Sequence, residues 1–235
     1  MIKKVEVLVS FPVKAKFYGN LDQLVYHNFI GFIKKLTCFN IDARCKECDM
    51  RKDCFYYKLS GENNHEYPGI IMKTNFFSSK TILSNEDKIF DFYFLGDCQM
   101  FTEYVSLYFT NLNQMLFGNF FYLKNITESF LSEEYIDCNI LKVSTFIEST
   151  SFTSTYNDMI HYYNQAYNTS FKEIEETIDL QDYRKIQIIK DYGNGKKSVK
   201  QGYVGNVNKR IKIPQDLLEI GIGKYNSFGG GHLEN

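Results

Sequence analysis

The sequence predicts an α+β protein with the element order of ferredoxin-like domains, strand–helix–strand–strand–helix–strand. Two patterns lead to this prediction. Near the N-terminus, a stretch of alternating valines is followed by apolar residues at helical spacing. Further along, paired runs of β-branched and aromatic residues precede a second helical pattern. The order can be read twice along the 235 residues, a length that can bury one good core or two small ones.

The first strand and the first helix have clear limits. A strand is expected from Ile2 to Phe11, where valines alternate with other residues until Pro12 ends the run. Residues 14–20 form a basic and aromatic loop in which Asn20 can cap the following helix. That helix should run from 21 to about 36, with an apolar face made by Leu21, Val25, Phe29, Phe32 and Leu36. Helical geometry then places Gln23, His27 and Lys34 on the opposite face, away from the core.

The later elements follow from the same two periodicities. Strands are expected within 69–94 and at 118–125 and 138–146, and helices at 97–113, 155–167 and 214–218. The dipeptide Asn194-Gly195 is a strong signal for a two-residue turn, so 184–190 and 198–207 should form a β-hairpin.

The most specific motif lies in the last fifteen residues, where four glycines follow the pattern G-h-G-x5-G-h-G, h being a residue that can pack. They are Gly221, Gly223, Gly229 and Gly231. Glycine pairs let one backbone approach another, or a ligand, more closely than a Cβ would allow. Between the pairs lie Lys224, Tyr225, Asn226 and Ser227, which suit phosphate binding and base stacking. A flexible tail is the alternative, but the symmetry of the pairs and Ile222 within the first favour a folded loop.

This motif resembles the C-terminal glycine-rich loop of the CRISPR-associated RAMP superfamily, specifically its endoribonucleases that process repeat RNA. Three further stretches are similar to the branch of that family with a four-cysteine insertion: YHNFIGFIKKLTC from Tyr26, FYFLGDCQMFTEYVSLYF from Phe92 and KQGYVGNV from Lys200. The resemblance implies two ferredoxin-like (RRM-like) folds in tandem, or one intact and one degenerate. We place the domains at 1–128 and 129–235, with a cysteine-rich knuckle at 38–54 after the first helix.

The resemblance also implies an activity: metal-independent cleavage of CRISPR precursor RNA within its repeats, through attack of a ribose 2′-hydroxyl on the adjacent phosphate. Many family members carry a catalytic histidine early in the first helix, the position of His27, where imidazole can act as base or acid near neutral pH. Tyr26 or Tyr18 would assist it, and Lys34 or Lys35 would stabilise charge on the phosphate. Other members use lysines and tyrosines instead, so such a set is the alternative.

The charge distribution indicates an RNA-binding face although the formal net charge is only −1. Residues 184–212 hold nine Lys or Arg and one acid, whereas 173–182 is acidic. A local basic block is typical of a phosphate-binding surface, and an ordinary solvated hairpin is the other interpretation. The predicted RNA contacts combine this block with the terminal motif: Lys190, Lys196, Lys197, Lys200, Lys209, Arg210, Gly221, Gly223, Lys224, Tyr225, Asn226, Ser227, Gly229, Gly231 and His232.

Four cysteines follow the spacing C-x6-C-x2-C-x5-C: Cys38, Cys45, Cys48 and Cys54. Four thiolates in a short polar segment suit a tetrahedral zinc ion, which would be structural and would order the segment. Isolated free thiols are the alternative. The proposed cleavage itself requires no cofactor.

Other classes of protein find little support. The chain has no P-loop, no Rossmann fingerprint after a strand, no G-x-S-x-G and no H-E-x-x-H. Its N-terminus lacks the apolar core of a signal peptide, and no apolar run approaches a membrane span, so we expect a cytoplasmic protein without membrane contact. Three functions remain, in this order. The first is the endoribonuclease, which can stay bound to the mature guide RNA. The second is a non-cleaving RAMP subunit that holds guide RNA among other CRISPR effector subunits. The third is a zinc-stabilised protein–protein adaptor.

Overall fold

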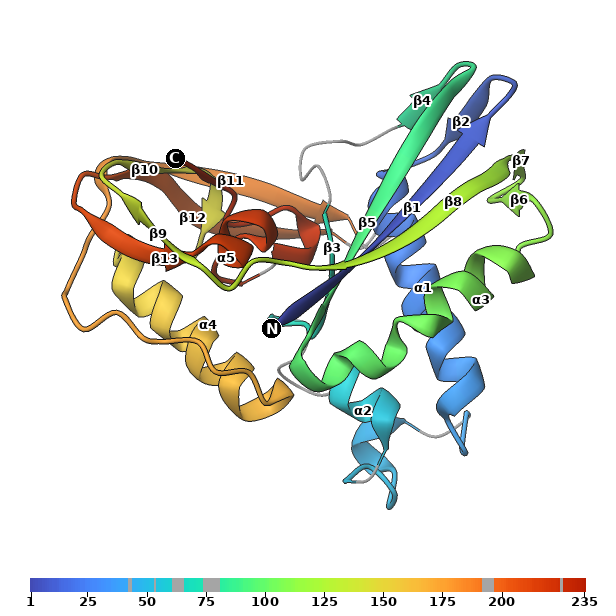
Figure 1. The fold of residues 1–235 in the computed structure, drawn as a ribbon, viewed down its shortest axis with the longest axis horizontal. Coiled ribbons are helices and arrows are strands. Elements are labelled where there is room, and N and C mark those ends of the chain that lie inside the picture. Colours follow the sequence, from blue (N-terminus) through green and yellow to red (C-terminus); the bar gives the residue numbers. More distant parts are fainter. Residues whose placement is uncertain (42–43, 53, 61–65, 74–80, 192–196, 225) are drawn as a thin grey trace.

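Strand β1 (Ile2–Phe11) runs through the middle of the first of two four-stranded sheets (Figure 1). The computed structural model describes residues 1–41, 44–52, 54–60, 66–73, 81–191, 197–224 and 226–235. The predicted first strand is confirmed with the same limits, because its valines point into the core while the residues between them are only partly buried.

The first lobe has the complete ferredoxin-like topology. Its sheet order is β3-β5-β1-β8, all pairs antiparallel. Helices α1 and α3 lie on one face of this sheet (Figure 1). The elements that follow β1 are α1 (Leu21–Thr37), β3 (Ile70–Met72), β5 (Glu86–Leu95), α3 (Glu103–Asn111) and β8 (Tyr122–Phe130).

The second lobe repeats this topology. Its sheet order is β11-β12-β10-β14, so the strands occupy the same relative places as β3-β5-β1-β8. The elements are β10 (Leu141–Ile147), α4 (Phe152–Tyr167), β11 (Gln181–Asp191), β12 (Lys197–Val207), α5 (Gln215–Ile220) and β14 (Leu233–Glu234). The second helix and last strand are short, so the two folds are unequal. The predicted tandem ferredoxin-like fold is confirmed.

Smaller elements complete the two lobes. Short strand pairs join β2 to β4, β6 to β7 and β9 to β13. Their limits are β2 (Ala15–Phe17), β4 (Thr81–Leu83), β6 (Met115–Leu116), β7 (Asn119–Phe120), β9 (Tyr135–Cys138) and β13 (Ile211–Pro214). Short helical turns are η1 (Cys45–Glu47), α2 (Phe55–Ser60), η2 (Gly96–Phe101) and η3 (Asn226–Phe228).

Helix α1 begins and ends close to its predicted limits. The Asn20 side chain accepts a hydrogen bond from the backbone N–H of Gln23 at 3.1 Å, as an N-cap should. The predicted apolar face is wrong at its end, because Leu36 is 54% exposed and Ile33 is buried instead. Leu36 lies in the last turn, where α1 extends past the sheet (Figure 1).

Two other predicted elements differ from the structure. The expected loop at 14–20 contains strand β2, which becomes a strand because it pairs with β4, more than sixty residues away. The single helix expected at 97–113 is divided into η2 and α3, with Thr102 between them. The chain leaves the first sheet at the end of β8 (Phe130) and enters the second at the start of β10 (Leu141), with β9 in between. The predicted boundary after residue 128 falls within β8.

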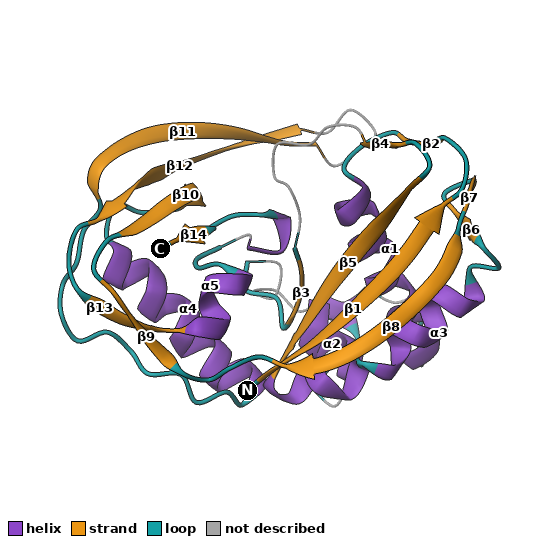
Figure 2. Cartoon of the chain, turned by 45° about the horizontal axis from the view of Figure 1, so that its top comes forward, coloured by secondary structure: helices purple, strands orange, loops and turns teal. Residues whose placement is uncertain are grey.

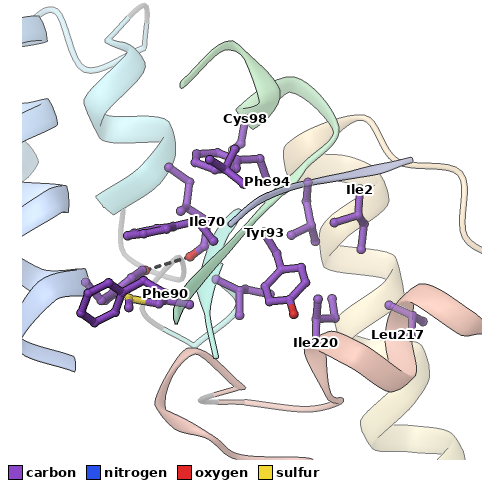
Figure 3. Packing of buried hydrophobic residues seen from close by; sticks show 14 of the residues in the cluster. Ile2, Ile70, Phe90, Tyr93, Phe94, Cys98, Leu217 and Ile220 are labelled. Carbon is purple, nitrogen blue, oxygen red and sulfur yellow. Dashed lines mark hydrogen bonds between the residues drawn. The ribbon is translucent and has the colours of Figure 1, made fainter. Parts of the chain in front are cut away.

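The two lobes share one continuous core. Leu217 and Ile220 of α5 lie beside Tyr93 and Ile2 of the first sheet (Figure 3). The hydroxyl of Tyr93 also donates a hydrogen bond to Glu219 of α5 at 3.4 Å. Burial of these side chains therefore fixes the second lobe against the first.

A second contact between the lobes lies at the end of α4. The hydroxyl of Tyr167 donates to the carbonyl of Tyr67 at 2.9 Å. Gly69 lies against the Tyr167 ring, where a Cβ would overlap both this ring and the thiol of Cys98.

No helix among the described residues is long and apolar enough to cross a membrane.

Candidate functional site

The glycine-rich motif forms a closed loop between α5 and β14. The backbone N–H of Ile222 donates to the carbonyl of Gly231 at 3.0 Å. Gly221 lies just as close, because a Cβ there would meet the carbonyl oxygens of Gly230 and Gly231 at 2.9 and 3.0 Å. All four motif glycines have positive φ, between 65° and 87°, a region that favours glycine. The two glycine pairs thus pack on each other's backbone.

Hydrogen bonds attach this loop to the second sheet and to α4. The N–H of Gly231 donates to the carbonyl of Phe146 at 2.8 Å, and the N–H of His232 donates to Thr145 Oγ1 at 2.7 Å. The side chain of Asn226 donates to the hydroxyl of Tyr163 at 2.9 Å. These contacts hold the loop in one position relative to the second lobe.

The middle of the loop reaches the first lobe. Its turn η3 contacts strand β3, and Figure 2 shows the two elements side by side. Tyr26 of α1 meets the same strand, donating its hydroxyl hydrogen to the carbonyl of Ile70 at 3.0 Å. Burial raises the pKa of Tyr26, and a hydrogen bond with Ser227 of η3 opposes this rise. The structure therefore brings the first helix and the glycine-rich loop together on β3.

The residues predicted to take part in catalysis have different surroundings. His27 is exposed on α1, as expected, and its ring lies 5.6 Å from that of Tyr26, edge to face. Tyr26 itself is buried, so its hydroxyl faces the core and not the solvent beside His27. Tyr18 is 81% exposed just before α1, with the ammonium of Lys16 5.0 Å from its ring.

The two predicted lysines lie at the far end of the helix. Lys34 donates to the carbonyl of Ile41 at 3.3 Å and lies over the ring of Tyr56, so it contacts the cysteine-rich segment and α2. Lys35 is exposed. Since Lys34 follows His27 by seven residues, the two lie on one face, about 10 Å apart along the helix axis.

The predicted RNA contacts within the loop fall into two groups. Asn226 and Ser227 are buried, at 2% and 1% exposure, because their side chains hold the loop in place. Their contact with RNA stays a prediction, made by two side chains that lie in the interior. Three other predicted contacts are partly exposed: Lys224, Gly229 and His232. Three of the glycines are buried: Gly221, Gly223 and Gly231. Tyr225 lies outside the described residues.

Lys224 of the loop contacts residues of both lobes. Its backbone N–H donates to Glu148 Oε2 at 3.1 Å, and its ammonium lies 2.8 Å from Glu66 Oε2. The other oxygen of Glu148, Oε1, accepts a hydrogen bond from the hydroxyl of Tyr67 at 3.4 Å. Burial raises the pKa of Glu148, and the N–H of Lys224 opposes the rise. Glu148 was not predicted, because a single Glu just after a strand belongs to no motif.

His232 lies at the other end of the loop, half-buried beside lysines. Burial lowers its pKa, and the charges of Lys73 and Lys142 lower it further, while Glu234 opposes them. Its imidazole is therefore neutral at neutral pH, and Lys73 at the end of β3 places a cation nearby.

The basic hairpin is confirmed as β11 and β12, which run across the second lobe toward the first (Figure 2). Lys190, Lys197 and Lys200 belong to its strands, and Lys196 lies outside the described residues. Lys209 and Arg210 come after the hairpin, where they pair with Glu176 at 2.8 Å and Asp137 at 3.0 Å. The predicted basic residues thus do not all lie on the hairpin.

The four predicted zinc ligands are half-buried, free thiols. Among the residues that the structure describes, no three His, Cys, Asp or Glu side chains converge to hold a metal ion. Zinc binding by Cys38, Cys45, Cys48 and Cys54 stays a prediction.

Fold and site together define a two-lobed protein of tandem ferredoxin-like folds with a glycine-rich loop held between them. Among solved structures, the chain is similar to one described as an RAMP protein binding different RNA substrates, at 13% identity and TM-score 0.54, covering 99% of this chain and 98% of that one. A Cas6 product complex matches at 10% identity and TM-score 0.54, covering 99% of each chain. A Cas6-related protein from Pyrococcus furiosus matches at 14% identity and TM-score 0.52, covering 100% of this chain and 98% of that one.

No protein-family model and no curated protein sequence matches this chain. At these low sequence identities, the structural likeness shows that this chain shares the fold of those proteins over nearly the whole length of both chains. The structural neighbours are Cas6 and RAMP proteins, from the family whose motifs the sequence resembles. The branch with the cysteine insertion stays a prediction.

Proposed function

We propose that this chain is an endoribonuclease that cleaves CRISPR precursor RNA within its repeats and can stay bound to the mature guide RNA. The observation that supports this most is the meeting of α1 and the glycine-rich loop on β3, in a fold shared along its whole length with Cas6 and RAMP structures. One of those is described as binding RNA substrates and another as a product complex. The proposal transfers that kind of substrate to this chain.

The proposed reaction needs no metal ion. His27 as base removes the proton of a ribose 2′-hydroxyl, whose oxygen attacks the adjacent phosphorus. The bond from phosphorus to the 5′-oxygen breaks, and this oxygen takes a proton from an acid in the site. The products are a 2′,3′-cyclic phosphate and a 5′-hydroxyl. A lysine near the phosphate would stabilise the charge that develops on its oxygens.

RNA binding is assigned to the basic hairpin and the glycine-rich loop. Arg184 and Lys185 are exposed on β11, and Lys224 and His232 border the loop. RNA stems are bound by shape and phosphate contacts, which suits a basic hairpin better than a helix that reads base edges. Other subunits of a CRISPR effector complex are proposed partners of the bound product.

A non-cleaving RAMP subunit that holds guide RNA is the second candidate. One observation favours it: the hydroxyl of Tyr26 and the ammonium of Lys34, two of the predicted assistants of His27, are both bound to backbone carbonyls within the fold. A histidine without its assistants would contact RNA but cleave it slowly.

Analysis of reaction products separates the two candidates. The protein is incubated with an RNA of its cognate repeat and with a scrambled RNA of the same composition. The endoribonuclease gives a single cut in the repeat, with a 2′,3′-cyclic phosphate on the upstream fragment. Salt-dependent binding of intact repeat RNA without a cut would favour the guide-holding subunit, and absence of binding would leave the protein–protein adaptor.

A further inference from the structure

Glu148, in the residues just after β10, uses both carboxylate oxygens at the junction between the lobes. Oε2 accepts the backbone N–H of Lys224, from the glycine-rich loop of the second lobe. Oε1 accepts the hydroxyl of Tyr67, which precedes β3 in the first lobe. One half-buried side chain therefore links the loop to both lobes.

The loop is built closely around this carboxylate. A Cβ at Gly223 would lie 2.7 Å from Glu148 Oε2 and 2.8 Å from a methyl carbon of Thr155, so the backbone at this position has no room to shift toward Glu148. Gly223 also has φ +75°, which favours glycine here. The fit places the next residue, Lys224, with its N–H toward Glu148.

The side chain of Lys224 then extends toward the first lobe. Its ammonium lies 2.8 Å from Glu66 and 6.0 Å from the centre of the Tyr67 ring, and the side chain is 33% exposed. Tyr67 therefore contacts Glu148 through its hydroxyl and Lys224 through its ring. Glu148 fixes the backbone of Lys224, and the neighbouring groups set the direction of its ammonium.

We propose that Glu148 is the positioning residue of the glycine-rich loop, which holds the Lys224 ammonium where it meets an RNA phosphate. This inference rests on the proposed RNA-binding function. Glu148 need not touch RNA. Its contribution is to hold the N–H of Lys224, which a neutral side chain of the same shape can also do. A carboxamide keeps an acceptor oxygen for Lys224 and offers an N–H to the Tyr67 oxygen.

The test measures dissociation constants for a repeat RNA that carries 2′-deoxy residues to prevent cleavage, at several salt concentrations. We expect Glu148→Ala to weaken binding at least ten-fold and Glu148→Gln to stay within three-fold of the wild type. The Ala variant should lose one phosphate contact. A plot of the logarithm of its dissociation constant against the logarithm of the salt concentration should therefore be less steep than that of the wild type, by about 0.7 to 0.9, whereas the plot for the Gln variant should keep the wild-type slope. Glu86→Ala, an exposed carboxylate at the start of β5, is the control.

Three results would overturn the inference. They are Glu148→Ala binding within two-fold of the wild type, equal losses in the Ala and Gln variants, or a loss in Ala with an unchanged salt slope. The last would mean that the change removes folded protein and not a contact; circular dichroism of each variant reports this directly. If the wild type binds neither repeat RNA nor unrelated RNA appreciably, the proposed function itself fails. That result is distinct from the other three, which concern the variants.

Discussion

Ile222 and Gly231 meet backbone to backbone, because the N–H of Ile222 donates to the carbonyl of Gly231 at 3.0 Å. A Cβ at Gly231 would overlap the carbonyl group of Ile222. Ile222 itself is fully buried. The two G-h-G pairs therefore hold the C-terminal loop closed within the second ferredoxin-like fold. The fold requires their glycines whether or not a ligand binds.

Gly231→Ala is expected to destabilise the protein by about 2 kcal/mol or more, since it combines a positive φ of 65° with overlap on backbone atoms that cannot move aside. Thermal unfolding measures the effect. Gly118→Ala separates the two causes, because Gly118 has φ +79° but open space around it, and should cost about 1 kcal/mol. Gly31→Ala, in open space within α1, should be neutral or stabilising. Equal melting temperatures for all three variants would contradict this account.

Glu66→Gln is expected to raise the affinity for RNA two- to five-fold at low salt, because Glu66 competes with phosphate for the Lys224 ammonium. Lys224→Ala should weaken binding and lower the salt slope. In the Lys224→Ala background, Glu66→Gln should have no effect. A gain of the same size in that background would mean that Glu66 acts through general repulsion of RNA and not through Lys224.

Asp216 of α5 should make the protein less stable as pH rises. The residue is fully buried, neither side-chain oxygen has a hydrogen-bond partner of good geometry among the described residues, and burial raises its pKa to about 6. Since the folded protein holds this proton more tightly than the unfolded chain does, the free energy of unfolding falls as pH rises from about 4 to about 6. The rise from 3.8 to about 6 corresponds to about 3 kcal/mol.

Asp216→Asn removes this titration. We expect it to match the wild type in urea unfolding at pH 4 and to be more stable by about 2 to 3 kcal/mol at pH 7.5. Asp137→Asn is a control with the opposite pH dependence, because pairing with the Arg210 guanidinium lowers the pKa of the Asp137 carboxyl. That carboxylate stabilises the folded state above its unfolded pKa and loses this contribution as pH falls. Parallel stability curves for wild type and Asp216→Asn would refute the prediction.

Zinc binding by the cysteine-rich segment predicts about one zinc ion per chain in protein purified under reducing conditions. A Cys45→Ser, Cys48→Ser double variant should lose the metal and unfold at a lower temperature, whereas Cys98→Ser, a buried thiol of the core, should keep it. Atomic absorption gives the metal content. The same zinc content in the double variant and the wild type would show that these thiols are not the ligands.

Local patterns predicted the elements of the fold that depend on few neighbours. Strand β1 and the N-cap at Asn20 followed from alternation and capping chemistry. The hairpin β11–β12 followed from the Asn-Gly signal and the flanking runs, although the predicted turn at 194–195 lies outside the described residues. Strand β2 could not be predicted, since it exists through pairing with β4, which is distant in the sequence. The exposure of Leu36 depends on where the sheet ends beneath α1, which helical periodicity does not contain.

The sequence predicted the motif of the site but not the residues that hold the glycine-rich loop in place. The glycine pattern revealed the loop, and helical geometry placed His27 at the surface. Burial of Tyr26 and Ser227 arises only when α1 and η3 meet on β3, so their side chains could not be assigned to the interior beforehand. The role of Glu148 depends on two lobes coming together, and no local sequence signal records it.

The most direct test of the central claim is cleavage of the cognate repeat RNA in EDTA. It uses protein shown by circular dichroism to stay folded in the chelator, and compares RNAs with single 2′-deoxy substitutions. The account predicts a cut in EDTA that one 2′-deoxy residue abolishes, and a loss of at least a hundred-fold in single-turnover rate for His27→Ala with RNA affinity within three-fold. Cleavage that continues past every 2′-deoxy substitution, or an undiminished rate in His27→Ala, would contradict it.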